Sequence, residues 1–144
     1  VFIRSLATRG AYGALTVALP AIIQVCALDC DIVIVETAGA GQVDVEIHEY
    51  VNTFVSVVAP LGDAITLMKS GQTEHAHVVV VNGRKGMEGI SGFIEQARVI
   101  LGNTVIEEDW TRKVFVVDAK CNDGIDQLVC DGILSRLGPP ASHH

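Results

Sequence analysis

The sequence has few aromatic residues, no long apolar run and no signal-peptide pattern. Aromatic side chains make up 5% of the 144 residues, and Trp110 is the only tryptophan, so the core must be aliphatic. No apolar run reaches the roughly 20 residues that a bilayer-spanning helix needs. No charged segment followed by an apolar one opens the chain. We therefore expect no membrane association and no signal peptide.

Basic residues are also scarce. The chain has 10 Lys and Arg against 17 Asp and Glu, which gives a formal net charge of −7. Nucleic-acid surfaces need clustered Lys and Arg, so we expect no nucleic-acid partner. The four cysteines show no C-x-x-C spacing, and Cys26 and Cys30 lie four apart on an expected helix. This pattern favours ordinary packing and a reducing, cytoplasmic location over a disulfide or a metal site.

Runs of β-branched residues alternate with helical patterns along the chain. Strands are expected at 1–3, 31–35, 54–59, 78–81 and 113–117, and a glycine-rich loop at 8–13. Helices are expected at about 16–28, with Pro20 as a kink or start, and at 45–51, 63–75, 90–101 and 125–137. Buried strands separated by amphipathic helices predict an α/β fold, a mostly parallel sheet with helices on both faces. We expect one domain over residues 1–138 and a tail at 139–144, whose two histidines resemble a tag remnant.

Functional groups in such sheets collect just past the carboxyl ends of the strands. That rule selects four segments: 36–42, 60–63, 82–86 and 118–123. In the first, Glu36 ends a strand and small residues follow. The Gly39 N–H is suited to a phosphate oxygen, and Glu36 to a water bound to Mg²⁺. The alternative is a plain strand-to-helix turn with Gly for tightness.

Two segments carry a family resemblance. Residues 2–10 read Phe-Ile-Arg-Ser-Leu-Ala-Thr-Arg-Gly, and residues 36–42 read Glu-Thr-Ala-Gly-Ala-Gly-Gln. With the strand before Glu36, they resemble the G proteins that act as chaperones of adenosylcobalamin-dependent methylmalonyl-CoA mutase. Bacterial members were formerly described as arginine/ornithine transport-system kinases. The resemblance continues through 52–54, 62–63, 78–82, 119 and 124–126, and so covers nearly the whole chain.

The resemblance implies a P-loop GTPase fold that binds GTP or GDP and Mg²⁺. It implies a mutase-type partner. We also expect a homo-oligomer, and a location in the cytoplasm or, in a eukaryote, the mitochondrial matrix. By carry-over, the catalytic residues are Glu36, which also holds Mg²⁺ through water, and Gln42. The carried-over nucleotide contacts are Arg4, Ser5 and Arg9 in the first switch, Gly39 and Gly41 in the second, and Asn82 and Ala119 at the base.

The phosphate-binding loop of the family is missing from these residues. The sequence has no G-x-x-x-x-G-K-[ST] motif and no Gly-Lys pair. The backbone N–H groups, Lys and hydroxyl of that motif hold the phosphates and Mg²⁺. In the family the motif precedes the first switch, and its strand lies inside the sheet beside the strand that ends at Glu36. The sequence therefore predicts a GTPase domain truncated at its N-terminus, in which the remaining strands re-pair or a neighbouring chain supplies one.

The guanine-recognition motif N-K-x-D is altered. Asn82-Gly83-Arg84-Lys85 stands in its place, and a lysine cannot accept the hydrogen bonds that guanine N1 and N2 donate. Gly83 lacks the aliphatic stem that covers the base. The lost charge-assisted hydrogen bonds are worth about 1.5–3 kcal/mol each. We therefore expect that the chain alone neither binds GTP tightly nor hydrolyses it.

Other interpretations stay open. One is a pseudo-GTPase that retains only a protein-docking surface. Another is an unrelated flavodoxin-like or receiver-like module, which Glu36, Asp63 and Lys120 imitate poorly. A metal site at His75 and His77 is disfavoured because the two residues fall at an expected helix-to-strand junction. Residues 107–110 are interpreted as an acidic surface turn with a packed Trp110.

Overall fold

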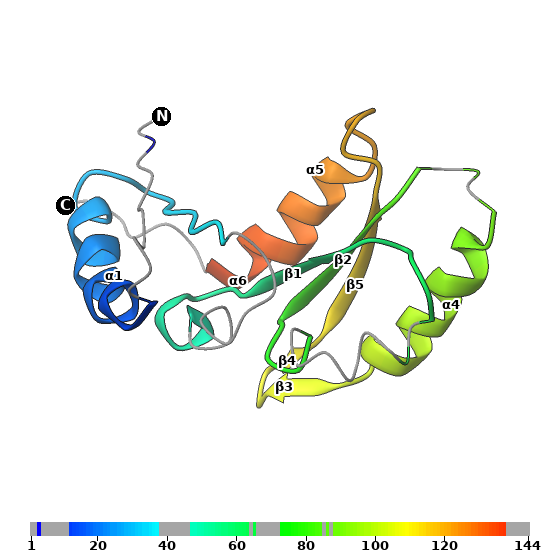
Figure 1. The fold of residues 1–144 in the computed structure, drawn as a ribbon, viewed down its shortest axis with the longest axis horizontal. Helices are drawn as coiled ribbons and strands as arrows, with labels where there is room; N and C mark the ends of the chain where they lie inside the picture. The colour runs from blue at the N-terminus through cyan, green and yellow to red at the C-terminus, as the bar shows by residue number, and fades with distance from the viewer. Residues whose placement is uncertain are drawn as a thin grey trace. The chain divides into compact units, whose positions relative to one another are not determined.

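The computed structural model describes residues 3, 12–37, 47–63, 65, 73–84, 86 and 88–137. The chain divides into two compact units, Val1–Tyr50 and Val51–His144. Figure 1 shows helix α1 in the first unit and the parallel sheet in the second. The predicted tail at 139–144 lies outside the described residues. Among the residues that are described, no helix is both long and apolar enough to cross a membrane.

Helix α1, Tyr12–Cys26, belongs to the first unit. It confirms the predicted helix but begins earlier, so the expected loop at 8–13 is helical from Tyr12 onward. Pro20 lies inside the helix, not at its start. A proline there has no N–H to donate and crowds the preceding turn, which favours a local bend. After Cys26 the chain closes with a short turn in which the Leu28 N–H donates to the Val25 carbonyl (3.2 Å).

The predicted strand at 31–35 is wrong as a strand. Residues 31–37 contain no strand, and Ile32 and Ile34 are 51% and 87% exposed instead of buried on both faces. A strand exists only where a neighbour accepts its backbone hydrogen bonds, and no sheet pairing of the described residues includes this segment. Of the predicted strand at 1–3, only Ile3 is described, and it is exposed and not in a strand.

Two predicted helices are shorter than expected or largely undescribed. In place of the helix at 45–51, the structure has the 3₁₀ helix η1, Ile47–Tyr50. Of the helix predicted at 63–75, Ile65 is helical, whereas 73–75 form a turn. Positions 45–46, 64 and 66–72 of these two predictions lie outside the described residues.

The second unit is built on a three-stranded parallel sheet in the order β1-β2-β5. The strands are β1 (Val55–Val58), β2 (Val78–Asn82) and β5 (Lys113–Val117). They confirm three of the predicted strands and the parallel arrangement. The register pairs Val55 with Val78, and Val78 with Lys113.

Helices cover both faces of this sheet, as predicted. The middle strand β2 has Val78–Val81 at 0–2% exposure, which explains its unbroken run of valines. Its odd-numbered valines pack with α4 (Ile90–Leu101), through Phe93, Ala97 and Leu101. Its even-numbered valines pack with Phe115 and Leu128 against a helical run at the C-terminal end. Figure 1 shows α4 and that run on opposite sides of the strands.

The C-terminal helical run changes type along its length. It consists of α5 (Ile125–Gln127), the π-helix η2 (Leu128–Leu134) and α6 (Ser135–Leu137), so the predicted helix at 125–137 is confirmed in extent. In the π turn the Ser135 N–H donates to the Cys130 carbonyl five residues back. The Asp131 carbonyl then accepts hydrogen bonds from the side chains of Ser135 and Lys113.

The predicted acidic turn at 107–110 is the turn of a short hairpin. Strands β3 (Val105–Glu107) and β4 (Trp110–Thr111) pair antiparallel just before β5. The two acidic residues between the strands, Glu108 and Asp109, are exposed. The turn was therefore placed correctly, but its flanking strands were not predicted, because three- and two-residue strands carry too little periodicity to be recognised.

Candidate functional site

The carboxyl ends of β1, β2 and β5 lie at one edge of the sheet, because the three strands are parallel. We call this the carboxyl edge and define it by the described residues of 59–63, 82–84 and 118–123. Three of the four segments selected from the sequence thus meet at one edge of the second unit. The fourth, 36–42, belongs to the first unit.

Asn82 and Ala119 are brought together at the carboxyl edge. The Ala119 N–H donates to the side-chain oxygen of Asn82 at 3.2 Å, and both residues are exposed. The contact joins the end of β2 to the loop after β5. The hydrogen bond also occupies the Ala119 backbone donor, so a base that used this donor would have to displace Asn82. The assignment of both residues as nucleotide contacts remains a prediction.

The loop after β5 is closed by its own backbone. The Asp118 N–H donates to the Asp123 carbonyl (3.0 Å), and the Asp123 N–H donates to the Asp118 carbonyl (3.1 Å). The Lys120 N–H is held by the Asp118 carboxylate at 3.1 Å. Asn122 has a φ of 56°, a left-handed conformation that Asn tolerates better than most residues. The loop therefore holds Ala119 in place without a ligand.

Gly83 has no room for a side chain. A Cβ atom there would lie 2.7 Å from Pro60 Cγ and 2.8 Å from Ile90 Cδ1. The Gly83 N–H donates to the Val117 carbonyl at 3.0 Å, which fixes its backbone to β5. A lysine at this position, which would supply a stem over a base, cannot be accommodated unless Pro60 or Ile90 shifts. The glycine is thus a packing requirement of this chain as well as a departure from the N-K-x-D pattern.

The switch residues predicted from the sequence are mostly outside the described residues. This applies to Arg4, Ser5, Arg9, Gly39, Gly41 and Gln42, and also to Lys85 of the altered motif. Glu36 is described: it is exposed and lies in the segment 31–37, which has no regular secondary structure. Within the part of the chain that the structure describes, no group of three or more His, Cys, Asp or Glu could hold a metal ion. The Mg²⁺ role of Glu36 remains a prediction.

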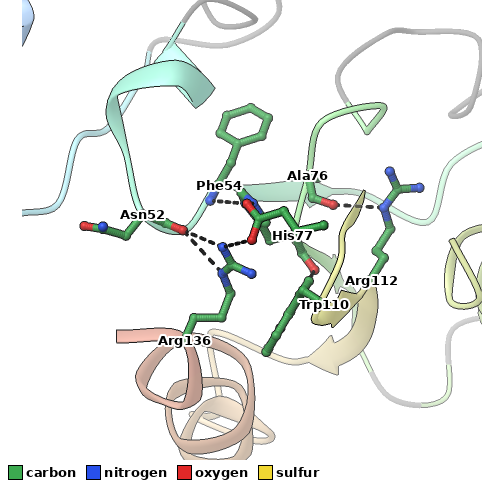
Figure 2. Close-up of polar contacts among 8 residues, drawn as sticks. Asn52, Phe54, Ala76, His77, Trp110, Arg112 and Arg136 are labelled. Atoms are coloured by element: carbon green, nitrogen blue, oxygen red, sulfur yellow. Dashed lines mark hydrogen bonds and ion pairs between the residues drawn. The ribbon is translucent and has the colours of Figure 1, made fainter. Parts of the chain in front are cut away.

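A polar cluster occupies the opposite, amino edge of the sheet, at the start of β2 (Figure 2). The buried His77 ring accepts a hydrogen bond at Nδ1 from the Phe54 N–H (2.9 Å). Its hydrogen is therefore at Nε2, which lies 2.8 Å from the Glu107 carboxylate and donates to it. The Trp110 indole N–H donates to the His77 carbonyl at 2.9 Å. His77 thus links the loop before β1 to the β3–β4 hairpin.

Arg136 adds α6 to the same cluster. Its guanidinium donates to Glu107 (2.9 Å) and to the Asn52 carbonyl (2.9 Å), and it lies 4.7 Å from the centre of the Trp110 ring. The hydrogen bond from His77 and that from Arg136 lower the pKa of Glu107 below its ordinary value of 4.5. We call His77, Glu107, Trp110 and Arg136 the amino-edge cluster.

Sequence reasoning missed the amino-edge cluster. It considered His77 only as a metal ligand beside His75, and it interpreted Glu107 and Trp110 as a surface turn. The four residues are up to 59 positions apart in the sequence (136 − 77), and no short motif connects them. One signal was present: a single tryptophan and an acidic residue bracket a turn directly before a buried strand. Such a tryptophan usually finds a partner for its N–H.

Comparisons with known proteins identify relatives over most of the chain. A family model described as methylmalonyl Co-A mutase-associated GTPase MeaB matches residues 1–134. A Pyrococcus abyssi protein named as a candidate GTPase is 37% identical over 132 residues, which cover 89% of this chain and 41% of that protein. The fused isobutyryl-CoA mutase of Cupriavidus metallidurans is 41% identical over 148 residues, covering 96% of this chain and 13% of that protein.

The GTPase ArgK of Escherichia coli is 31% identical over 134 residues, which cover 88% of this chain and 40% of that protein. The chain therefore spans about two fifths of the length of the Pyrococcus and Escherichia relatives. No solved structure matches the chain.

Proposed function

Because this chain belongs to the family of methylmalonyl-CoA mutase-associated GTPases, we propose that it is a divergent portion of a GTPase domain that serves an acyl-CoA mutase. A relative that is itself a fused isobutyryl-CoA mutase supports the mutase as partner. Within the family, GTP binding and hydrolysis would gate delivery of the cobalamin cofactor to the mutase. This chain would contribute the switch segments and the base-binding edge. A cytoplasmic or matrix location stays a prediction.

One observation carries the proposal that this portion holds nucleotide poorly. At the carboxyl edge Asn82 still contacts Ala119, yet Gly83 is packed so that a side chain fits only if Pro60 or Ile90 shifts. The next positions are Arg84 and Lys85, which can donate but not accept hydrogen bonds. Guanine presents two N–H donors to the Asp of N-K-x-D, so the segment 82–85 lacks the acceptor that would select guanine.

The phosphate side supports the same proposal. These 144 residues contain no Gly-Lys pair, and hence no lysine positioned by a phosphate loop. The proposed first-switch contacts are Arg4, Ser5 and Arg9, and the proposed second-switch contacts are Glu36, Gly39, Gly41 and Gln42. Switch residues respond to a terminal phosphate but do not by themselves anchor a nucleotide. Glu36 and Gln42 would act only after a phosphate loop has placed GTP and Mg²⁺.

A titration with a fluorescent GTP analogue and Mg²⁺ tests the proposal. The 144-residue chain is expected to show no saturation below about 100 µM, because each lost charge-assisted hydrogen bond weakens binding about tenfold or more. A second protein, extended upstream with the matching segment of the Escherichia coli relative, is expected to bind more tightly. Saturation of the unextended chain at low micromolar GTP, with ATP excluded, would overturn the proposal.

A matched variant separates the base from the phosphates. In the extended protein, Lys85→Asp is expected to raise the preference for GTP over ATP about tenfold to hundredfold, because the new carboxylate accepts from guanine N1 and N2. Arg84→Asp places the same charge one residue away and is the control. Equal gains in both variants would show a general charge effect instead of base recognition.

The second candidate function is a protein-docking module without nucleotide. The altered segment Asn82-Gly83-Arg84-Lys85 favours it, because a module that works without nucleotide does not need the residues that recognise a base. The module would bind a mutase or a second copy of itself. A purified mutase retained by the immobilised chain, or a dimer in sedimentation velocity, supports this function. A monomer that retains no mutase, with or without GTP, excludes it.

A further inference from the structure

A groove runs along the outer edge of β5, and its lining residue Lys113 lies 4.4 Å from the centre of the Trp110 ring in the amino-edge cluster. It has a volume of about 560 Å³. One wall is the end of α4, with Arg98 and Gly102, and the other is the C-terminal helical run, with Gln127, Asp131 and Ser135. Because α4 and that run cover opposite faces of the sheet, a groove that touches both must lie at the sheet's edge.

The floor of the groove is unpaired strand backbone. The Lys113 N–H donates to the His77 carbonyl, and the Val117 carbonyl accepts from the Gly83 N–H, so positions 113, 115 and 117 face β2. Backbone groups alternate along a strand, so those of Val114 and Val116 face away from β2, and Val114 also lines the groove. Neither residue's outward groups have a hydrogen-bond partner among the described residues.

The two ends of this edge are already closed. At one end the Arg112 N–H donates to the Thr104 carbonyl at 2.8 Å. At the other, Gly124 sits so close to the Val116 carbonyl that a Cβ there would lie 2.5 Å from it. The open groups are therefore the Val114 N–H, the Val114 carbonyl and the Val116 N–H. That set matches a short extended segment of about three residues, added as one further strand.

The charge of the groove indicates which kind of segment it would bind. Arg98, Arg112 and Lys113 line it against the single carboxylate of Asp131, in a chain whose net charge is −7. Arg112 is buried and Glu74 partly offsets its charge, whereas Lys113 donates to the Asp131 carbonyl and lies over the Trp110 ring. Arg98 is exposed and makes no ion pair with any described residue. A second copy paired across this edge would bring both sets of cations together, which disfavours self-association.

We propose that the β5 edge binds a short, extended, acidic segment of a partner protein by β-strand addition, with Arg98 pairing a carboxylate of that segment. Alternate residues of the bound segment face opposite sides of the sheet. Acidic residues would face α4 and Arg98. Small apolar residues would face Phe115 and the C-terminal helical run. The proposal does not depend on nucleotide, and the edge is separate from the carboxyl edge.

The first experiment uses fluorescence anisotropy with a labelled peptide of alternating Glu and Val, six residues long, and the full 144-residue chain. We expect saturable binding, which Arg98→Glu weakens about fivefold to tenfold by replacing attraction with repulsion. Arg84→Glu, the same change at the carboxyl edge, is expected to leave binding unchanged. A peptide of alternating Lys and Val is expected not to bind.

The second experiment leaves the protein unaltered and modifies the peptide. Methylation of the peptide nitrogens that face β5 removes donors to the Val114 carbonyl and is expected to weaken binding about threefold to tenfold. Methylation of the alternate nitrogens is the control. In hydrogen exchange by NMR, bound peptide is expected to slow the Val114 and Val116 amides, whereas the Phe115 amide is already protected by β2.

Five results would overturn the proposal. Four are absence of binding at millimolar peptide, equal binding of the Lys-Val peptide, equal effects of the two methylated peptides, and exchange protection elsewhere than Val114 and Val116. The fifth is a dimer in sedimentation velocity that Arg98→Glu strengthens, since the occupant would then be a second copy. These outcomes are independent of GTP titrations.

Discussion

The two ends of the β1-β2-β5 sheet are held by different kinds of contact. At the amino edge, buried His77 and the guanidinium of Arg136 join the loop before β1, the β3–β4 hairpin and α6. At the carboxyl edge, the one side-chain hydrogen bond between β2 and the loop after β5 is the exposed 3.2 Å contact of Asn82 with Ala119, as far as the described residues show. The amino edge is tied through side chains, and the carboxyl edge mainly through backbone.

In the second unit, side chains of the amino edge contribute to stability, whereas those of the carboxyl edge are available for function. Side chains engaged in a network cannot be released for a ligand without a cost in free energy. The exposed side chains of the carboxyl edge can change with little cost, and the altered motif at 82–85 lies there. Gly83 is the exception, because its lack of a side chain is fixed by packing.

The largest effect is expected for His77→Ala. The change removes a buried ring, leaves the Phe54 N–H without an acceptor and frees Glu107 from one partner. We expect a loss of about 2–4 kcal/mol in the free energy of unfolding, measured by urea denaturation. Asn82→Ala, the comparable deletion at the carboxyl edge, is expected to change it by less than about 0.5 kcal/mol. Equal losses would contradict the contrast between the two edges.

The next largest effect is expected at the carboxyl edge itself. Gly83→Ala forces a methyl group against Pro60 and Ile90 and should cost about 1–3 kcal/mol. Gly92→Ala is the control: nothing lies within 4 Å of a Cβ there, and it sits in α4. The control should gain up to about 1 kcal/mol, because alanine favours helix over glycine. A tolerated Gly83→Ala would show that room exists at position 83 for a base-covering side chain.

The sequence predicted β2, β5 and α4 well because each has its own strong pattern. Four valines in a row favour a strand buried on both faces, and α4 has an apolar residue at each turn from Ile90 to Leu101. The segment 31–35 is also rich in β-branched residues, yet it is not a strand. A β-branched composition favours a strand only where another strand is available for pairing, and that partner strand comes from a different part of the chain.

Part of the candidate site could likewise be predicted from the sequence, and part of it could not. Asn82 and Ala119 could be placed at one edge, because parallel strands end together and each residue directly follows a strong strand. The packing around Gly83 could not be predicted, since it depends on Pro60 and Ile90, which come from other segments. The β5 groove could not be predicted either. Its position depends on which strand lies at the edge of the sheet, and the order of strands in a sheet is not a local property of the sequence.

A smaller effect is expected for Arg136→Met. Methionine keeps much of the apolar stem beside Trp110 but removes the hydrogen bonds to Asn52 and Glu107. We expect a loss of about 1–2 kcal/mol in the free energy of unfolding. Arg84→Met, at an exposed position of the carboxyl edge, should change it by less than about 0.5 kcal/mol. No difference between the two variants would show that α6 is held to the sheet by apolar packing alone.

The smallest effect is expected from Glu107 and depends on pH. Its pKa in the folded chain is lowered, first by the hydrogen bond from His77 and then by Arg136. A lowered pKa means that the ionised carboxylate stabilises the fold above the unfolded value of about 4.5, and that this stabilisation is lost as the pH falls through the lower, folded value.

Glu107→Gln should therefore cost less than about 1 kcal/mol at pH 7, since the carboxylate is half exposed and screened. The difference from the unmodified chain should shrink as the pH is lowered from 5 toward 3, as measured by urea unfolding at each pH. The control is Glu108→Gln, because Glu108 is exposed and has no hydrogen bond among the described residues. A difference that grows in acid would reverse the sign and show that Glu107 is held protonated. The amino edge would then be held by a neutral hydrogen bond. It would differ from the Asn82 contact of the carboxyl edge in the number of contacts and not in their charge.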